Sequence, residues 1–273
     1  MKKRSVFERI AAIPPVSWSV LFILAPLGFV LYFALTDRNG AFTLENLRAL
    51  SSYSGTFFMS VGFSLIATAV CLLVGYPLAY AMSKTQERTR GVLMVLLMLP
   101  MWISLLIRTY SLMALLDNGG IVSGFLVKLG FEKLTFIGTE GAVILGMIYD
   151  FLPYMVLPIY TALKKIDNGM IEAAEDLGAN PLRVVTRVVI PQTVPGILSG
   201  ITMVFMPAVT TFAISYMLSN GTIYLTGDMI DEFFRGLNNR NAGSALSLVM
   251  MLLMLGSTLL LRRANPNQKG GKA

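Results

Sequence analysis

The segment KKIDNGMIEAAEDLGANPLRVVTRVVIPQTVPG, residues 164–196, is a charged and amphipathic stretch between two almost wholly apolar runs. Acidic residues precede Gly178, which is a candidate helix C-cap, and Pro181 suits the first turn of a second helix. The apolar residues of this second helix recur at spacings of three and four, at Leu182, Val185, Val188 and Val189. We therefore expect two short helices at a membrane surface, with one face free to enter the groove of a soluble partner.

Apolar stretches of bilayer-spanning length lie on both sides of this segment. A membrane-spanning helix needs about 20 residues, and six stretches approach that length. They cover residues 17–36, 57–82, 92–116, 141–163, 194–218 and 245–261. The chain is 55% hydrophobic and 14% charged, with a mean hydropathy of +0.68, whereas soluble domains carry about 25% charged residues. The sequence predicts an all-α integral membrane protein with six transmembrane helices, and excludes a soluble globular enzyme.

The apolar stretches predict the domain boundaries, and the placement of Lys and Arg predicts the orientation in the membrane. We divide the chain into a tail over 1–16, a first helix over 17–36, a transmembrane core over 57–261 and a tail over 262–273. The two tails and the loops after the second and fourth stretches hold 15 of the 22 basic residues, against six in the opposite loops. Because cytoplasmic loops carry the excess of basic residues, both termini are expected in the cytoplasm. Topology and anionic lipid account for the net charge of +7, so we expect no nucleic-acid partner.

The residue inventory also limits the chemistry. One cysteine and no histidine exclude a disulfide framework, and leave the usual zinc site and the Ser-His-Asp triad without an imidazole. No G-x-x-x-x-G-K-[ST] loop occurs, so the chain has no usual means of holding ATP phosphates. We therefore expect no catalytic residue, no metal site and no cofactor bound by this chain itself.

The charged segment carries a spaced motif. Glu172-Ala173-Ala174 is followed after three residues by Gly178, and after nine more by Val188-x-Ile190-Pro191. This pattern resembles the EAA signature of ABC-importer permeases, whose loop forms a coupling helix that docks on the ATP-binding subunit. The resemblance implies that loop 164–193 couples this chain to an ATPase, with the alanines permitting close approach and Gly178 making the sharp turn. Val188 and Ile190 stand where the family has Ile and Leu, a departure that conserves shape.

Three further stretches resemble the spermidine/putrescine permeases of that family. They are residues 100–110 (PMWISLLIRTY), 152–160 (LPYMVLPIY) and 242–245 (AGSA). The resemblance implies a type I importer of the bacterial inner membrane, in which two permease subunits, two ATPases and an extracytoplasmic binding protein cooperate and the ATPases use the ATP. Permeases for sulfate, iron and thiamine share this architecture, so another solute, including another organic cation, stays an alternative. A secondary transporter that works alone and a membrane scaffold without transport are the alternatives from other classes.

Two ionisable residues, Arg108 and Asp150, lie within predicted spans. At about 1.5 Å per residue, both lie roughly 12–14 Å below the outer surface, and this equal depth predicts a direct ion pair between them. The pair either fixes the packing of the third and fourth helices or leaves Asp150 to attract the ammonium groups of a polyamine. In the second case cation–π faces would come from Trp102, Tyr110, Tyr149 and Tyr154. The stretch with Asp228, Asp231 and Glu232 is expected as a solvated loop.

Overall fold

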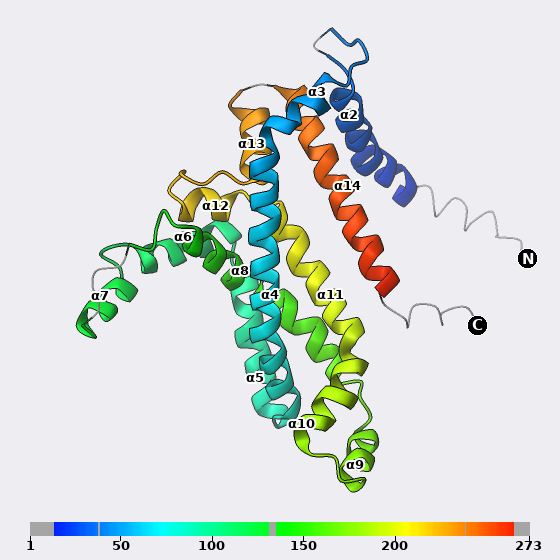
Figure 1. Ribbon diagram of the computed structural model, residues 1–273, viewed down its shortest axis with the longest axis vertical. Coiled ribbons are helices and arrows are strands. Elements are labelled where there is room, and N and C mark those ends of the chain that lie inside the picture. Colours follow the sequence, from blue (N-terminus) through cyan, green and yellow to red (C-terminus); the bar gives the residue numbers. More distant parts are fainter. Residues whose placement is uncertain (1–13, 38, 131–134, 238, 265–273) are drawn as a thin grey trace, which may run out of the picture. The chain divides into compact units, whose positions relative to one another are not determined.

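The computed structural model describes residues 14–37, 39–130, 135–237 and 239–264, which are folded almost entirely as helices (Figure 1). Among them, five helices are long and apolar enough to cross a membrane. They run over Pro14–Ala34, Glu45–Lys84, Glu140–Leu163, Pro181–Val209 and Arg240–Leu261. A sixth span results if the bent pair Glu87–Trp102 and Leu105–Phe125 is counted as one. The predicted all-α membrane fold is confirmed.

The chain divides into two compact units, residues 1–54 with 229–253 and residues 55–228 with 254–273. The elements of the first unit are η1 (Val20–Leu24), α2 (Ala25–Ala34), α3 (Glu45–Ala49), η2 (Leu50–Tyr53) and most of α13 (Thr226–Arg235), with the first part of α14 (Arg240–Ala264). The side-chain amides of Asn46 and Asn241 both donate to the carbonyl oxygen of Thr36, at 2.8 and 2.6 Å. These bonds tie the end of α2 to α3 and α14. The apolar side chains of η1 and α2 are largely exposed, as suits a helix surrounded by lipid.

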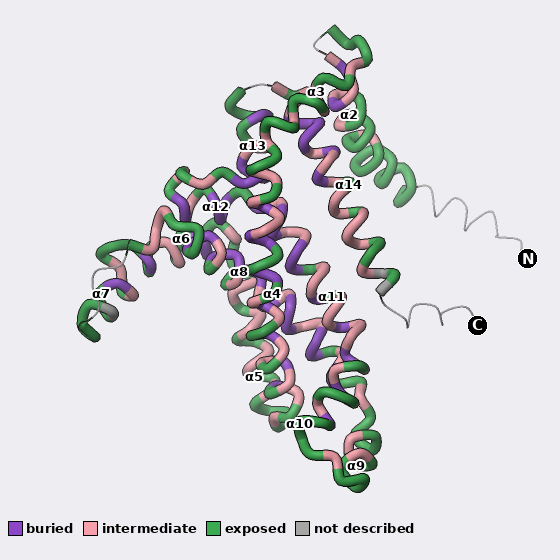
Figure 2. The backbone as a smooth tube through the Cα atoms, viewed as in Figure 1, coloured by how far each residue is buried: buried purple, intermediate pink, exposed green. Residues whose placement is uncertain are grey.

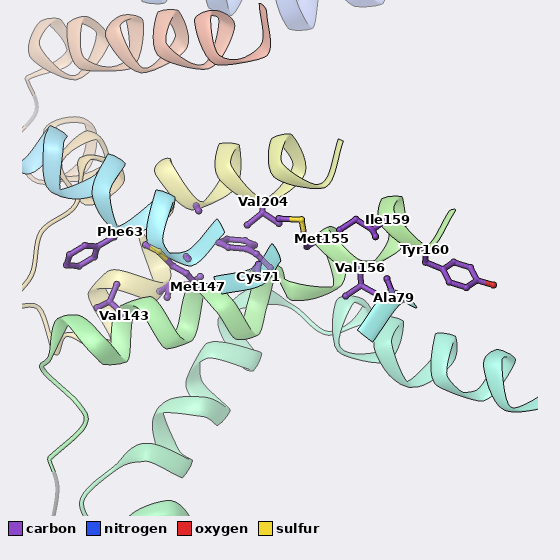
Figure 3. Packing of buried hydrophobic residues seen from close by; sticks show 14 of the residues in the cluster. Phe63, Cys71, Ala79, Val143, Met147, Met155, Val156, Ile159, Tyr160 and Val204 are labelled. Atoms are coloured by element: carbon purple, nitrogen blue, oxygen red, sulfur yellow. The ribbon is translucent and has the colours of Figure 1, made fainter. Parts of the chain in front are cut away.

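The second unit is built around α4 (Ser54–Lys84), α8 (Glu140–Leu163) and α11 (Ile190–Val209). Buried positions follow all three helices (Figure 2). Their facing side chains form one apolar core, which includes Met147, Met155, Val156, Ile159 and Val204 (Figure 3). The shorter elements are α5 (Glu87–Met98), η3 (Leu99–Trp102), α6 (Leu105–Leu116), α7 (Ile121–Lys128), α9 (Asn168–Asp176), α10 (Pro181–Val184), η4 (Val185–Val189) and α12 (Ala213–Leu218).

Helices α8 and α11 approach each other closely because glycines lie on the face of α11 that meets α8. A Cβ added to Gly196 would lie 2.8 Å from the carbonyl oxygen of Pro158, and one added to Gly200 would lie 2.7 Å from the sulfur of Met155. These distances leave no room for a side chain without a shift of the neighbours, so the two glycines set the helix spacing. The segment that joins α8 to α11 is therefore attached to two closely packed helices.

The third apolar stretch is not the straight helix expected over residues 92–116. It consists of α5, η3 and α6, and it bends by 100° between η3 and α6. Pro100 lies in η3, and Ile103 and Ser104 have ψ angles of 141° and 138°, outside the helical range. A proline removes the backbone donor to the turn that precedes it, but Met98 and Leu99 before Pro100 stay helical and the break comes after it, at Ile103 and Ser104.

The fifth stretch and the loop after it also differ from expectation. The helix begins at Pro181 and runs without interruption to Val209, so the second short helix of the charged segment continues into the span. The chain leaves the helical conformation near Thr210 and resumes it in α12. The expected solvated loop around Asp228 is the amphipathic helix α13, at whose start the Asp228 carboxylate accepts a hydrogen bond from the backbone N–H of Leu225 at 2.8 Å. This bond satisfies a free donor at the helix N-terminus.

Candidate functional site

The segment with the EAA motif folds as a capped helix–turn–helix at one end of α8 and α11 (Figure 1). The Asp167 carboxylate accepts from the N–H of Gly169 at 3.0 Å, and the Asn180 side-chain oxygen accepts from the N–H of Arg183 at 2.9 Å. Between the two helices Gly178 has a φ of +80°, in the left-handed region that side chains avoid. The caps and the turn therefore hold α9 and α10 in one fixed arrangement.

One face of this segment is anchored and the other is exposed. Val184 and Val189 are buried in the core of the second unit. By contrast, Leu177 is 89% exposed and Leu182 is 72% exposed, and Glu172 and Ala173 of the same segment are exposed too. Ala174 is half-buried and packs against the core. Two large apolar side chains exposed on either side of one turn favour an interaction surface there. The sequence analysis named Glu172, Ala173, Ala174, Gly178 and Pro191 for this surface, but not Leu177, whose apolar character next to the Gly178 turn was the available signal.

Pro191 lies within the continuous helix rather than at its start. It follows the π-helical turn η4 and is exposed. A proline at this position cannot donate to the carbonyl four residues before it, and the wider turn of η4 gives the ring room. The proline of the motif therefore coincides with an irregular turn between the exposed segment and the membrane-spanning part of α11.

Arg108 of α6 and Asp150 of α8 form a buried ion pair. Nε of Arg108 lies 2.9 Å from Oδ1 of Asp150, and the two side chains are 5% and 0% exposed. The Thr109 hydroxyl lies 3.1 Å from Oδ2 of the same carboxylate and also within 2.8 Å of the carbonyl oxygen of Leu105. Nε and Nη1 of Arg108 and Oδ1 of Asp150 are buried without a hydrogen-bond partner among the described residues, so Nε and Oδ1 make a charge contact without hydrogen-bond alignment. The carboxylate thus has a charge contact at Oδ1 and a hydrogen bond at Oδ2. The sequence analysis did not name Thr109, since nothing in its spacing distinguishes it.

The aromatic residues named with Asp150 do not surround it. Trp102 is 81% exposed, and Tyr110 and Tyr149 are also exposed, so these three rings lie on the outside of the described chain. Tyr154 is partly buried, with its ring 6.4 Å from that of Phe151. The structure therefore separates Tyr154 from the other three aromatic candidates.

A large cavity of about 800 Å³ lies between η3, α8 and α11. The residues that line it are Met101, Tyr154, Leu157, Pro158, Thr161, Ala162, Lys165, Gln192, Pro195, Gly196, Ser199 and Met203. Lys165 is the one charged residue among these described lining residues, and neither Arg108 nor Asp150 belongs to the lining. The cavity is thus mostly apolar, with a few hydroxyl and amide groups. The described residues also contain no group of three or more side chains able to hold a metal ion.

Comparisons with known proteins place these features in a family. The family model described as "Binding-protein-dependent transport system inner membrane component" matches residues 72–269. The spermidine/putrescine transport system permease protein PotB of Haemophilus influenzae is 36% identical over 269 residues, covering 95% of this chain and 94% of that protein. PotB of Escherichia coli K12 is 34% identical over 249 residues, covering 88% of this chain and 90% of that protein.

Solved structures share the fold at lower identity. One is a chain of a bacterial alginate ABC transporter, whose crystal structure contains an alginate pentasaccharide-bound periplasmic protein. This chain matches with a TM-score of 0.78 at 17% identity, and the match covers 97% of the present chain and 95% of the alginate transporter chain. A chain of the MetNI methionine ABC transporter, in inward-facing conformations, matches with a TM-score of 0.58 at 17% identity, covering 77% and 93%. Fold and sequence together show that the chain belongs to the family of binding-protein-dependent transport system inner membrane components.

Proposed function

We propose that this chain is the permease subunit of an ATP-driven ABC importer for polyamines of the spermidine and putrescine type. The observation that carries the proposal is the 36% identity to a spermidine/putrescine permease across 95% of the chain. An extracytoplasmic binding protein delivers the solute, and the membrane-spanning helices form part of the route across the bacterial inner membrane. The distribution of basic residues supports a cytoplasmic location for both termini.

The exposed face of α9 and α10 is the docking surface for the ATPase. Glu172 and Ala173 are exposed for contact with a partner groove, whereas the small side chain of Ala174 packs α9 against the core. Gly178 makes the turn between α9 and α10. Because this segment continues through Pro191 into α11, a movement of the ATPase is passed directly to a membrane-spanning helix. ATP is bound by the ATPase, and this chain contributes no cofactor of its own.

The cavity between η3, α8 and α11 is this chain's part of the solute route, and a second, homologous permease subunit supplies the rest. Tyr154 offers a ring to a passing ammonium group, a contact of about 0.5–2 kcal/mol. Asp150 is fully buried between Arg108 and Thr109 and does not line the large cavity, which supports a packing role for the Arg108–Asp150 pair in place of a contact with the solute.

Uptake of labelled spermidine tests the proposal in a deletion strain that carries this gene with its ATPase, second permease and binding protein. We expect uptake that requires the ATPase and that unlabelled putrescine inhibits, whereas sulfate and thiamine do not. Uptake that persists without the ATPase would indicate a secondary transporter. An assembled importer that takes up another solute and no polyamine would leave the permease role and overturn the substrate class.

A further inference from the structure

A second, smaller cavity of about 120 Å³ lies where α4 and α8 end and α9 begins. Its apolar lining includes Leu163 and Val189, which are buried. Its polar lining comprises the side chains of Tyr80, Ser83, Lys84, Lys164 and Asn168. We call it the lysine cavity; it does not share a lining residue with the large cavity of the proposed solute route.

Two exposed lysines, Lys84 and Lys164, line the lysine cavity without an ion-pair partner in the described chain. Neither Lys84 nor Lys164 has a carboxylate oxygen within 4.0 Å among the described residues, and no acidic residue lines the cavity. Nζ of Lys84 lies 5.8 Å from the centroid of the Tyr80 ring, which holds this ammonium group at the cavity. In the described part of the chain, the Tyr80 hydroxyl and the Asn168 amide group have no hydrogen-bond acceptor. The cavity thus combines two cations with two free neutral donors.

The lysine cavity lies at the level of a membrane surface. α4 and α8 both belong to membrane-spanning helices, and they end at Lys84 and Leu163. The loops that follow them carry the excess of basic residues that is typical of the cytoplasmic side. Basic pockets between helices at this level are suited to the phosphate groups of anionic lipids, because the headgroups lie at the same depth.

We propose that the lysine cavity binds a phosphate group, with Lys84 and Lys164 as point charges and the Tyr80 hydroxyl and Asn168 amide as hydrogen-bond donors. The headgroup of an anionic phospholipid and inorganic phosphate offer this same chemistry. A phospholipid fits the position at the membrane surface, where α4 and α8 end.

Acylation of lysines tests the proposal in the intact importer, reconstituted in nanodiscs of phosphatidylcholine with or without phosphatidylglycerol. Mass spectrometry follows the rate at which an amine-reactive reagent modifies each lysine. We expect phosphatidylglycerol to slow the acylation of Lys84 and Lys164 by about tenfold, because the bound phosphate holds both ammonium groups. Lys165 is the internal control: it is the next residue in the chain but lines the large cavity, so its rate should change by less than about twofold.

The other arms separate the source of the phosphate from competing explanations. Inorganic phosphate that protects the two lysines in phosphatidylcholine alone would support the site and assign it to the free ion. If the two lysines are protected in phosphatidylcholine alone and this protection disappears when the ATPase is removed, the lysines contact the ATPase and not a phosphate group. That result would overturn the proposal. Equal protection of Lys165, or no protection by either phosphate source, would overturn it too.

A pair of variants provides an independent measurement. Native mass spectrometry counts the phosphatidylglycerol molecules retained by the importer. K84Q/K164Q should retain about tenfold less than the wild type. The control R88Q/R263Q removes the same charge from exposed positions outside the cavity and should retain the wild-type amount. Equal losses in both variants would show a general surface effect and contradict the site.

Discussion

Replacing Asp150 with asparagine would leave the Arg108 guanidinium buried without its counter-charge. In the wild-type chain the ion-pair distance is 2.9 Å and the two side chains are 5% and 0% exposed. Removing one partner of such a pair costs about 3–5 kcal/mol, because the remaining charge stays out of water. We expect Asp150→Asn to lower the thermal midpoint of the assembled importer by on the order of 10 °C.

The double variant R108M/D150N separates a packing role from a contact with the solute. It removes both charges, keeps an oxygen acceptor for the Thr109 hydroxyl, and leaves no unpaired charge in the interior. Stability should therefore return to within about 1 kcal/mol of the wild type. Uptake per folded complex should return with it, since the Asp150 carboxylate is enclosed between Arg108 and Thr109.

Thermal midpoints are measured by size-exclusion chromatography after heating, and spermidine uptake is normalised to the folded importer. The control is R235M/D231N, which removes the exposed ion pair of α13, and surface pairs contribute only about 0–1 kcal/mol. A double variant that is as stable as the wild type but takes up no spermidine would refute the packing role and place the Asp150 carboxylate on the solute route. A single variant with an unchanged midpoint would show that the ion pair does not support the fold.

Three further predictions concern the docking surface and the α8–α11 contact. Leu177→Asp should leave the thermal midpoint of the isolated chain unchanged, because Leu177 is 89% exposed, and should abolish co-purification of the ATPase. Co-purification of the ATPase with this variant would show that Leu177 is not part of the docking surface. Gly178→Asp should insert normally into the membrane but lose ATP-dependent uptake, since a side chain at φ +80° costs about 1–2 kcal/mol and shifts α9; normal transport would count against the coupling role. Gly196→Ala should cost about 1–3 kcal/mol in stability, since its Cβ would lie 2.8 Å from the Pro158 carbonyl oxygen. The control Gly62→Ala in α4, where a Cβ has no atom within 4 Å, should not destabilise the chain. Equal thermal midpoints of the two variants would contradict the close approach of α8 and α11.

The features that follow from local sequence were predictable. A membrane-spanning helix is set by the hydrophobicity of its own residues, so Glu140–Leu163 differs from the expected 141–163 by a single residue. The turn at Gly178 follows from the conformational freedom of glycine at the end of a helix. The Arg108–Asp150 contact was also predictable, because two opposite charges in apolar helices have few other partners.

The features that depend on tertiary packing were not predictable. Pro100 marks an irregular turn, but the 100° bend lies at Ile103 and Ser104, two residues that carry no signal of a break in the sequence. The depth argument for Arg108 and Asp150 assumed a straight third helix, so it reached the correct contact from a geometry that the structure does not have. Trp102 and Tyr110 were grouped with Tyr154 by residue type, whereas only Tyr154 lines the large cavity. Neither cavity has a signature in the sequence, since each is lined from several elements.

Transport in proteoliposomes tests the central claim most directly. The purified importer consists of this chain, its second permease and its ATPase, and is reconstituted in liposomes. ATP is added to the compartment that holds the ATPase, and the binding protein and labelled spermidine are added on the opposite side of the membrane. The account predicts spermidine accumulation that requires ATP and the binding protein and stops when the ATPase is inactivated. Accumulation without ATP, or an importer that hydrolyses ATP in response to the loaded binding protein and moves no spermidine, would contradict it.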